Sequence, residues 1–165
     1  MGHAELLPIV KDTLAQYRIT HTVLECTPEL ADTAAFCAHY GFSLDQSANT
    51  ILVASKKSEP VKYAVCVVLA TTKLDVNKKV CELLNVKRVS FADAEATKEI
   101  TGMLIGGVTA IGVHDTPIYI DSAVMRQPQV VMGGGNRSSK VLLHPQELTK
   151  LPGVTVVEGL AKPKE

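Results

Sequence analysis

Apolar positions near the start of the chain recur at helical spacing, at Leu6, Leu7, Val10 and Leu14. This spacing predicts an amphipathic first helix. Residues 19–26 then alternate polar and apolar side chains and are rich in β-branched residues, which predicts a strand. A second helix is predicted over 28–40, because Thr27 is a typical N-cap and Pro28 suits the first helical position. This helix is expected to stop at Gly41.

The middle of the chain contains two strand patterns joined by a short polar turn. Residues 48–55 predict the first strand, and residues 61–70 are apolar on both faces, as a central strand would be. The polar turn over 56–60 favours a hairpin between them. Further along, the pattern predicts a helix over 74–85, a short strand over 86–91 and a helix over 92–102 that stops at Gly102.

Short strands dominate the last third of the chain. The pattern predicts strands over 117–124, 128–133 and 140–144, one or two helical turns over 145–151, an edge strand over 153–159 and a frayed tail over 160–165. Helices and strands mix along the chain, and short links join several strands, which fits a strictly alternating doubly wound fold less well. We therefore expect one α+β (mixed α/β) domain over residues 1–165, built as a curved, partly closed mixed β-barrel surrounded by helices.

Composition and charge narrow the possible functions. The chain has 165 residues with 17 basic and 17 acidic side chains, so binding of a nucleic acid needs a local basic patch. The four cysteines form no C-x-x-C pair, and we expect buried, reduced thiols. The histidines lack paired ligand spacing and no nucleotide-binding motif is present, so we expect no metal and no cofactor. Neither a signal peptide nor a membrane span is recognisable, which predicts a cytoplasmic protein.

Two glycine-rich segments interrupt the apolar pattern. They contain Gly106, Gly107 and Gly112 in MLIGGVTAIGV, and the run Gly133, Gly134 and Gly135 between two predicted strands. Backbone amides in such segments form nests for a carboxylate, a phosphate or a developing oxyanion, although both segments could equally be structural turns. Between them, Asp121 and Ser122 follow an apolar strand. They either form a turn that closes a hairpin or place a carboxylate in the same pocket.

Five stretches occur in an order that resembles a known family. They are SANTILV, the helix–strand–helix pattern over 74–102, IGGVTAIGV, PIYIDSAV and GGGNRSSKVLLHPQEL. Over most of its length the chain is similar to the YbaK/prolyl-tRNA synthetase-associated domain family of aminoacyl-tRNA editing domains. The resemblance implies a mixed β-barrel wrapped by helices that hydrolyses the ester between a tRNA and a wrongly attached amino acid. It implies no metal and no dedicated side-chain nucleophile. The partners that it implies are the acceptor end of mischarged tRNA and an aminoacyl-tRNA synthetase.

Two positions depart from the pattern of that family. The family's lysine falls on Asn49, whose amide donates without a charge and therefore forms a weaker hydrogen bond. The family's loop proline falls on Ala110, which loosens the loop and alters the size of the pocket. The resemblance gives catalytic roles to Asn49, Gly106 and Gly107. It gives substrate contacts to Ala110, Gly112, Asp121, Ser122, Gly133, Gly134, Gly135 and Asn136.

Basic residues form local groups within the neutral chain. Lys56, Lys57 and Lys62 flank the predicted hairpin turn, and Arg137 and Lys140 follow the triple glycine. Such groups commonly form a solvated face. If tRNA binds, these five are the best candidates for contacts with phosphates of the acceptor end.

The predicted reaction needs no catalytic side chain. An aminoacyl ester is activated, so an oriented water molecule and backbone amides directed at the oxyanion are sufficient for its hydrolysis. We therefore predict a freestanding aminoacyl-tRNA deacylase that clears mischarged tRNA. The alternatives are a catalytically weakened member that binds tRNA or a synthetase, and a hydrolase that acts on another aminoacyl ester.

Overall fold

The largest sheet has five strands in the order β5-β2-β3-β6-β9. Their bounds are β5 Val89–Phe91, β2 Ala48–Ser55, β3 Tyr63–Leu69, β6 Ile118–Asp121 and β9 Val154–Val157. The β2–β3 hairpin and the β2–β5 pair are antiparallel, whereas β3–β6 and β6–β9 are parallel. The computed structural model describes residues 5–27, 29, 33–57, 59–103, 107–113 and 116–163, without the side chains of residues 33 and 34. The predicted hairpin, central strand and edge strand are confirmed.

A second sheet has three antiparallel strands in the order β1-β8-β7. Its strands are β1 Thr22–Glu25, β8 Ser139–Leu143 and β7 Val130–Gly133. A bridge between Ser47, which precedes β2, and Val131 of β7 joins it to the five-stranded sheet. Within the described residues the strands form separate sheets and no closed barrel, so the partly closed barrel stays a prediction.

The third sheet contains two short strands that the sequence pattern does not reveal. β4 (Thr72–Leu74) pairs in antiparallel fashion with β10 (Ala161–Pro163). The prediction of a frayed tail is therefore wrong for residues 161–163, because this stretch is held by strand pairing.

Two helices end where glycines predict that they should. α2 (Thr33–Tyr40) is followed by Gly41 at φ +79°, and α4 (Ala94–Thr101) by Gly102 at φ +75°. Both angles lie in the left-handed region that glycine adopts without strain. The predicted start of the second helix at Pro28 lies outside the described residues.

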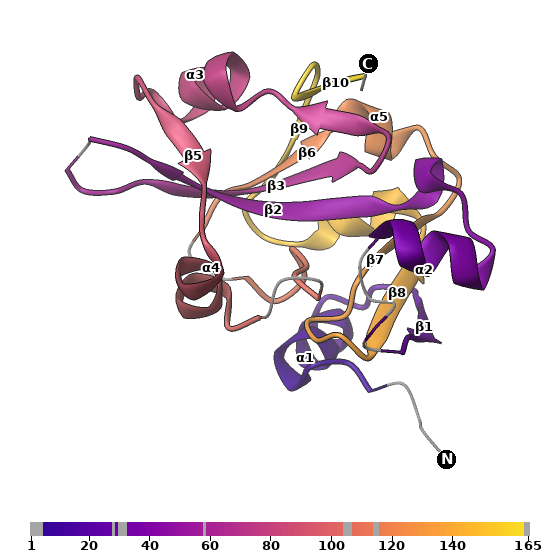
Figure 1. Ribbon diagram of the computed structural model, residues 1–165. Coiled ribbons are helices and arrows are strands. Elements are labelled where there is room, and N and C mark those ends of the chain that lie inside the picture. Colours follow the sequence, from indigo (N-terminus) through magenta and orange to yellow (C-terminus); the bar gives the residue numbers. More distant parts are fainter. Residues whose placement is uncertain are drawn as a thin grey trace.

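The other helical segments are short, except for the first helix. They are α1 Pro8–Gln16, η2 Leu44–Gln46, η3 Val76–Val80, α3 Cys81–Leu84, α5 Ser122–Met125 and η4 Pro145–Lys150. The strand predicted over 117–124 is too long, because β6 ends at Asp121 and α5 begins at the next residue. Figure 1 shows α3 above the five-stranded sheet and α1 below it, close to β7 and β8.

The core divides into three clusters, and successive side chains of a strand point alternately into different clusters. Ala48 and Leu52 of β2 face the largest cluster, which the two sheets and α1 enclose. Val53 faces a second cluster covered by η3 and α3, and α2 covers a third. Since side chains alternate along a strand, Asn49 lies on the same face of β2 as Val53. All four cysteines are free and buried, as predicted.

Candidate functional site

The two glycine-rich segments lie directly against each other. The N–H of Gly135 donates to the carbonyl oxygen of Gly107 at 2.7 Å. A Cβ atom at Gly107 would collide with the backbone of Asn136, whose Cα would be 2.7 Å away. A Cβ atom at Gly133 would lie 2.6 Å from the carbonyl oxygens of Gly107 and Val108. Glycine is needed on both sides because backbone meets backbone here. Gly106 lies outside the described residues.

The first helix and the residues just before it pack onto the triple-glycine segment from the other side. The N–H of Leu7 donates to the carbonyl oxygen of Gly134 at 3.0 Å, and Nδ2 of Asn136 donates to that of Glu5 at 2.9 Å. Gly135 has φ +93°, and a Cβ atom there would lie 2.7 Å from Cβ of Leu7. The triple glycine therefore lets α1 and the 107–113 loop approach the same short segment.

The same helix also contacts the first glycine-rich loop. Gly112 has φ +101°, and a Cβ atom there would lie 3.3 Å from the carbonyl oxygen of Ile9. Both glycine-rich segments therefore rest on α1, which fixes their positions relative to each other.

The backbone N–H groups of the two glycine-rich segments differ in whether they already donate a hydrogen bond within the protein. The N–H of Gly134 donates to the carbonyl oxygen of Ser139 at 3.2 Å, and that of Gly135 is taken by Gly107. These two amides would reach a substrate only if the segments separated. By contrast, four N–H groups of the first loop find no acceptor among the described residues: those of Gly107, Val108, Ala110 and Gly112.

Asn49 and Asp121 lie in one row across the five-stranded sheet. Asn49 is half-buried and pairs with Val68 of β3. Val67 pairs with Ile120 of β6, so the register places Val68 beside Asp121. Asn49 and Asp121 are thus two strands apart on the same face, at a backbone separation of about 10 Å.

The Asp121 carboxylate is engaged within the protein. It is 3% exposed and accepts hydrogen bonds from the backbone N–H groups of Ala161, Leu160 and Ser122. Burial raises the pKa of this carboxyl, and those three hydrogen bonds oppose the rise. In this arrangement Asp121 holds the chain between β9 and β10 in place.

Lys140 is buried, although its sequence context predicts an exposed contact with phosphate. It pairs with Gly133 across β7 and β8 and is 7% exposed. Its ammonium lies 5.5 Å from the centre of the Phe36 ring of α2. Burial raises the pKa of the Cys37 thiol, and the nearby charge of Lys140 opposes that rise. The Ser47–Val131 bridge lies two residues before Asn49 and Gly133, so Asn49, Gly133 and Lys140 surround the junction of the two large sheets.

Several other predicted site residues lie away from this junction or are engaged within the protein. Ala110 is 1% exposed and packs into the largest core cluster. Oδ1 of Asn136 accepts hydrogen bonds from Ser138 and Ser139, so this side chain organises its own turn. Lys56, Lys57 and Lys62 lie at the exposed tip of the β2–β3 hairpin. Lys56 is seven residues along the chain from Asn49, about 23 Å for an extended strand.

The structure also reveals surface features that the sequence did not indicate. An open groove of about 680 Å³ lies beside β4 and β10, where Lys73, Asp75 and Lys162 line it.

In the part of the chain that the structure describes, no three His, Cys, Asp or Glu side chains form a group that could hold a metal ion. No described helix is both long and apolar enough to cross a membrane.

Comparisons with known proteins place the chain in one family. The family model for the aminoacyl-tRNA editing domain matches residues 27–151. The uncharacterized protein YwhH of Bacillus subtilis (strain 168) is 28% identical over 145 residues, which are 87% of this chain and 89% of that protein. The crystal structure of hypothetical protein APE2540 is similar with a TM-score of 0.80 and 22% identity, over 93% of this chain and 99% of the other.

A proposed trans-editing enzyme for prolyl-tRNA synthetase has the same fold. Its crystal structure gives a TM-score of 0.78 at 22% identity and covers 97% of this chain and 100% of the other. These two structural likenesses establish the mixed α+β fold. Since the family model spans most of the sequence, the chain belongs to the family of aminoacyl-tRNA editing domains.

Proposed function

We propose that this protein hydrolyses the ester bond of mischarged aminoacyl-tRNA. Membership of the editing-domain family supports this function, and so does the fold shared with a proposed trans-editing enzyme. One observation carries the proposal. The two glycine-rich segments meet at Gly107 and Gly135, and the N–H groups of Gly107, Val108, Ala110 and Gly112 have no acceptor among the described residues. Such amides match the donors that a developing oxyanion requires.

The proposed reaction adds water to the ester carbonyl. The tetrahedral oxyanion is held by amides of the 107–112 loop, and collapse releases the free amino acid and the 3′-terminal hydroxyl of the tRNA. The side-chain amide of Asn49 orients the ester, while Ala110 and Gly107 shape the amino-acid pocket. A hydroxyl of the substrate or a loop carbonyl, such as that of Gly107, positions the water molecule.

Lys140 contributes a positive charge near this site. Its ammonium is buried beside Phe36, so a phosphate that it contacts must enter the junction of the sheets. The terminal phosphates of the tRNA acceptor end are the groups that we assign to it. Asp121 and Ser122 act in this scheme by ordering the β6 end of the pocket.

The test is deacylation of a panel of tRNAs that carry Ala, Ser, Thr, Cys or Pro. We expect release of at least one amino acid well above the spontaneous rate. Replacing Asn49 by Ala should lower kcat by about 100-fold, because a misplacement of the ester by about 1 Å costs about that much. Asn77→Ala serves as the matched control, because Asn77 is exposed in η3 and lies outside the proposed site. Release at the spontaneous rate with every substrate would refute the proposal.

A second function, binding of tRNA without hydrolysis, is favoured by one observation. The amides of Gly134 and Gly135 are both used inside the protein, so two of the three donors predicted in the triple glycine are unavailable in this conformation. Tight binding of tRNA without turnover by any substrate would support this second function. Gain of turnover in Asn49→Lys would then identify the missing charge as the cause.

A further inference from the structure

Phe91 exposes an aromatic ring at the edge of the five-stranded sheet. It is 56% exposed, more than the other exposed large hydrophobic residues of the described chain, among which Val61 reaches 44%. It ends β5, whose first residue, Val89, is buried in the second core cluster. The strand therefore anchors Phe91 while its ring stays in contact with solvent.

This ring lies on the same face of the sheet as Asn49. Phe91 pairs with Val53 of β2, and paired residues direct their side chains to one face. Asn49 lies on that face of β2 as well, four residues from Val53, which corresponds to about 13 Å along the strand. A few unpaired nucleotides span such a distance.

Basic residues surround the same end of the sheet. The N–H of Lys56 donates to the carbonyl oxygen of Arg88 at 2.9 Å, and Nζ of Lys62 donates to that of Leu84 at 3.0 Å. These two bonds tie the tip of the β2–β3 hairpin to the segment that enters β5. We define the hairpin surface as Phe91 together with Lys56, Lys57, Lys62, Lys87 and Arg88, all of which are exposed.

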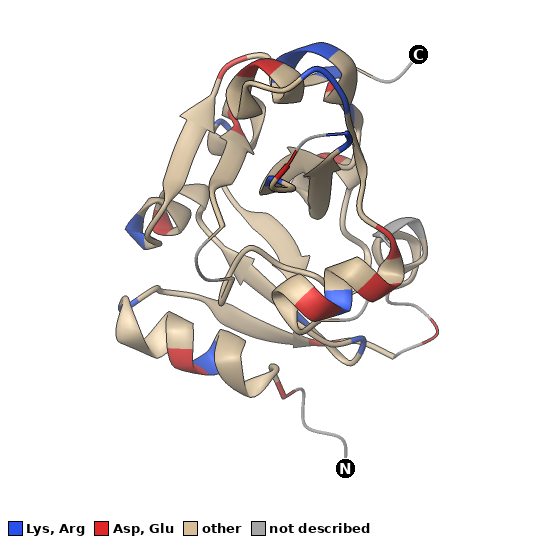
Figure 2. Cartoon of the chain, turned by 90° about the vertical axis from the view of Figure 1, so that its left-hand side faces the viewer, with Lys and Arg blue, Asp and Glu red and all other residues tan. Residues whose placement is uncertain are grey.

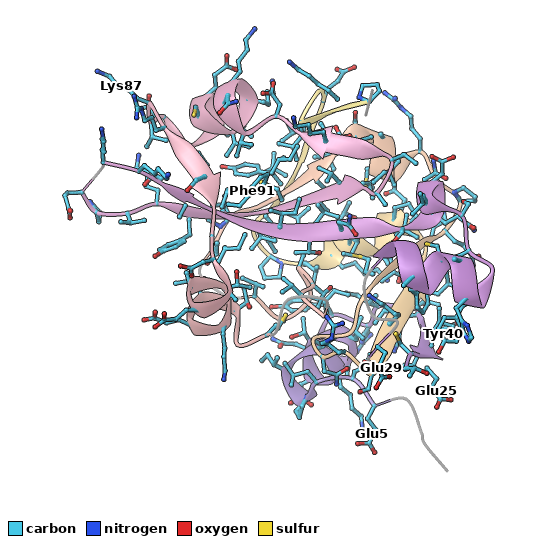
Figure 3. The ribbon with its side chains drawn as sticks, in the orientation of Figure 1. Glu5, Glu25, Glu29, Tyr40, Lys87 and Phe91 are labelled. Carbon is cyan, nitrogen blue, oxygen red and sulfur yellow. The ribbon has the colours of Figure 1, made fainter. Side chains whose placement is uncertain are left out.

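The charge of the molecule is unevenly distributed around this surface. Glu59 and Asp93 are the carboxylates nearest to it in sequence, and Asp93 is engaged in capping α4 through the N–H of Ala96. Figure 2, which views this end directly, shows several blue segments in its upper half, with red segments between them. Figure 3 shows Lys87 and Phe91 at this end and Glu5, Glu25 and Glu29 at the opposite one. A polyanion is therefore attracted to the hairpin surface although the chain is neutral overall.

We propose that the hairpin surface docks the acceptor arm of tRNA, with Phe91 stacked on an unpaired base. The five basic side chains contact phosphates, and the ring of Phe91 supplies the stacking platform that single-stranded nucleic acids use. The rest of the acceptor arm extends from the hairpin surface to the proposed site, where the ester is hydrolysed. This inference rests on the proposed function for its partner and adds where that partner binds.

The first experiment measures binding of uncharged tRNA by fluorescence anisotropy at fixed salt. Phe91→Ala should weaken binding by about 5- to 150-fold, the range for loss of one base–aromatic stack. Phe91→Trp should bind at least as well as the wild type. Leu44→Ala is the matched control, because Leu44 is 42% exposed in η2 and outside the hairpin surface. Equal affinity of Phe91→Ala and wild type would overturn the proposal.

The second experiment measures the salt dependence of the same binding. Each of Lys56→Gln and Lys87→Gln should reduce the slope of log K against log salt by about 1, because each removes one phosphate contact. Lys11→Gln, on the exposed side of α1, should leave the slope unchanged. Unchanged slopes in the first two variants would also overturn the proposal.

Uncharged tRNA carries no ester, so these results are independent of hydrolysis. If Phe91→Ala weakens binding but the wild type deacylates nothing, the docking surface stands and the proposed hydrolysis fails. If the wild type deacylates mischarged tRNA and Phe91→Ala leaves KM unchanged, the hydrolysis stands and the docking surface fails.

Discussion

Replacing Gly107 by Ala tests whether the two glycine-rich segments depend on direct backbone contact. The new Cβ atom would collide with the backbone of Asn136, which cannot move aside as a flexible side chain would. Overpacking of this kind costs about 1–3 kcal/mol. Separation of the segments would also weaken the 2.7 Å hydrogen bond from Gly135 to Gly107, worth about 1 kcal/mol. We therefore expect a loss of about 2–4 kcal/mol from the free energy of unfolding.

Urea denaturation followed by circular dichroism measures this loss. A parallel thermal scan should show Tm lowered by roughly 4–16 °C, since 1 kcal/mol corresponds to about 2–4 °C at this chain length. Gly102→Ala is the matched control, because Gly102 has φ +75° but nothing within 4 Å of the added Cβ. That variant bears backbone strain alone, about 1 kcal/mol. The reasoning is refuted if Gly107→Ala costs no more than Gly102→Ala.

Two further predictions concern single polar groups of the five-stranded sheet, Asp121 of β6 and Thr50 of β2. Because burial raises the pKa of Asp121 above its ordinary value of 3.8, the folded state binds a proton there more tightly than the unfolded state does. The free energy of unfolding should therefore fall as the pH rises from about that value through the raised pKa. Asp121→Asn should abolish this pH dependence, whereas Asp12→Asn, at an exposed position, should retain it. Urea titrations at several pH values measure the difference. Oγ1 of Thr50 is buried without a hydrogen-bond partner in the described part of the chain, so the isosteric Thr50→Val should raise the free energy of unfolding by about 1 kcal/mol. A loss of stability in Thr50→Val, measured against the exposed Thr155→Val, would contradict this explanation.

The alternation of apolar residues predicts the strands that contribute most to the core. The run over 48–55 corresponds to β2 without a shift, because its two faces contact two different core clusters. The pair β4–β10 escapes prediction because each strand has three residues and owes its structure to pairing with a distant segment. Lys162 and Pro163 carry no apolar pattern that would reveal this pairing.

The sequence predicts neither the direct contact between the glycine-rich segments nor the burial of Lys140. The glycines indicate nests for a ligand or structural turns, whereas in the structure the backbones of Gly107 and Gly133 meet each other. A lysine near the start of a strand is normally solvent-exposed. Lys140 is covered because Phe36 of α2 packs over it, and this tertiary contact leaves no trace in the local pattern.

The triple glycine affects the proposed reaction by determining where the 107–113 loop lies. Its amides at Gly134 and Gly135 hold neighbouring backbone, and its missing side chains admit α1 on one side and the 107–113 loop on the other. The loop amides without acceptors are therefore placed by a chain of contacts that begins at α1. A side chain at Gly135, where Cβ would lie 2.8 Å from Cγ2 of Val10, would displace the helix and the loop together. Deacylation should then decline although no group that touches the ester has changed, because oxyanion stabilisation depends on donors held in place before the reaction.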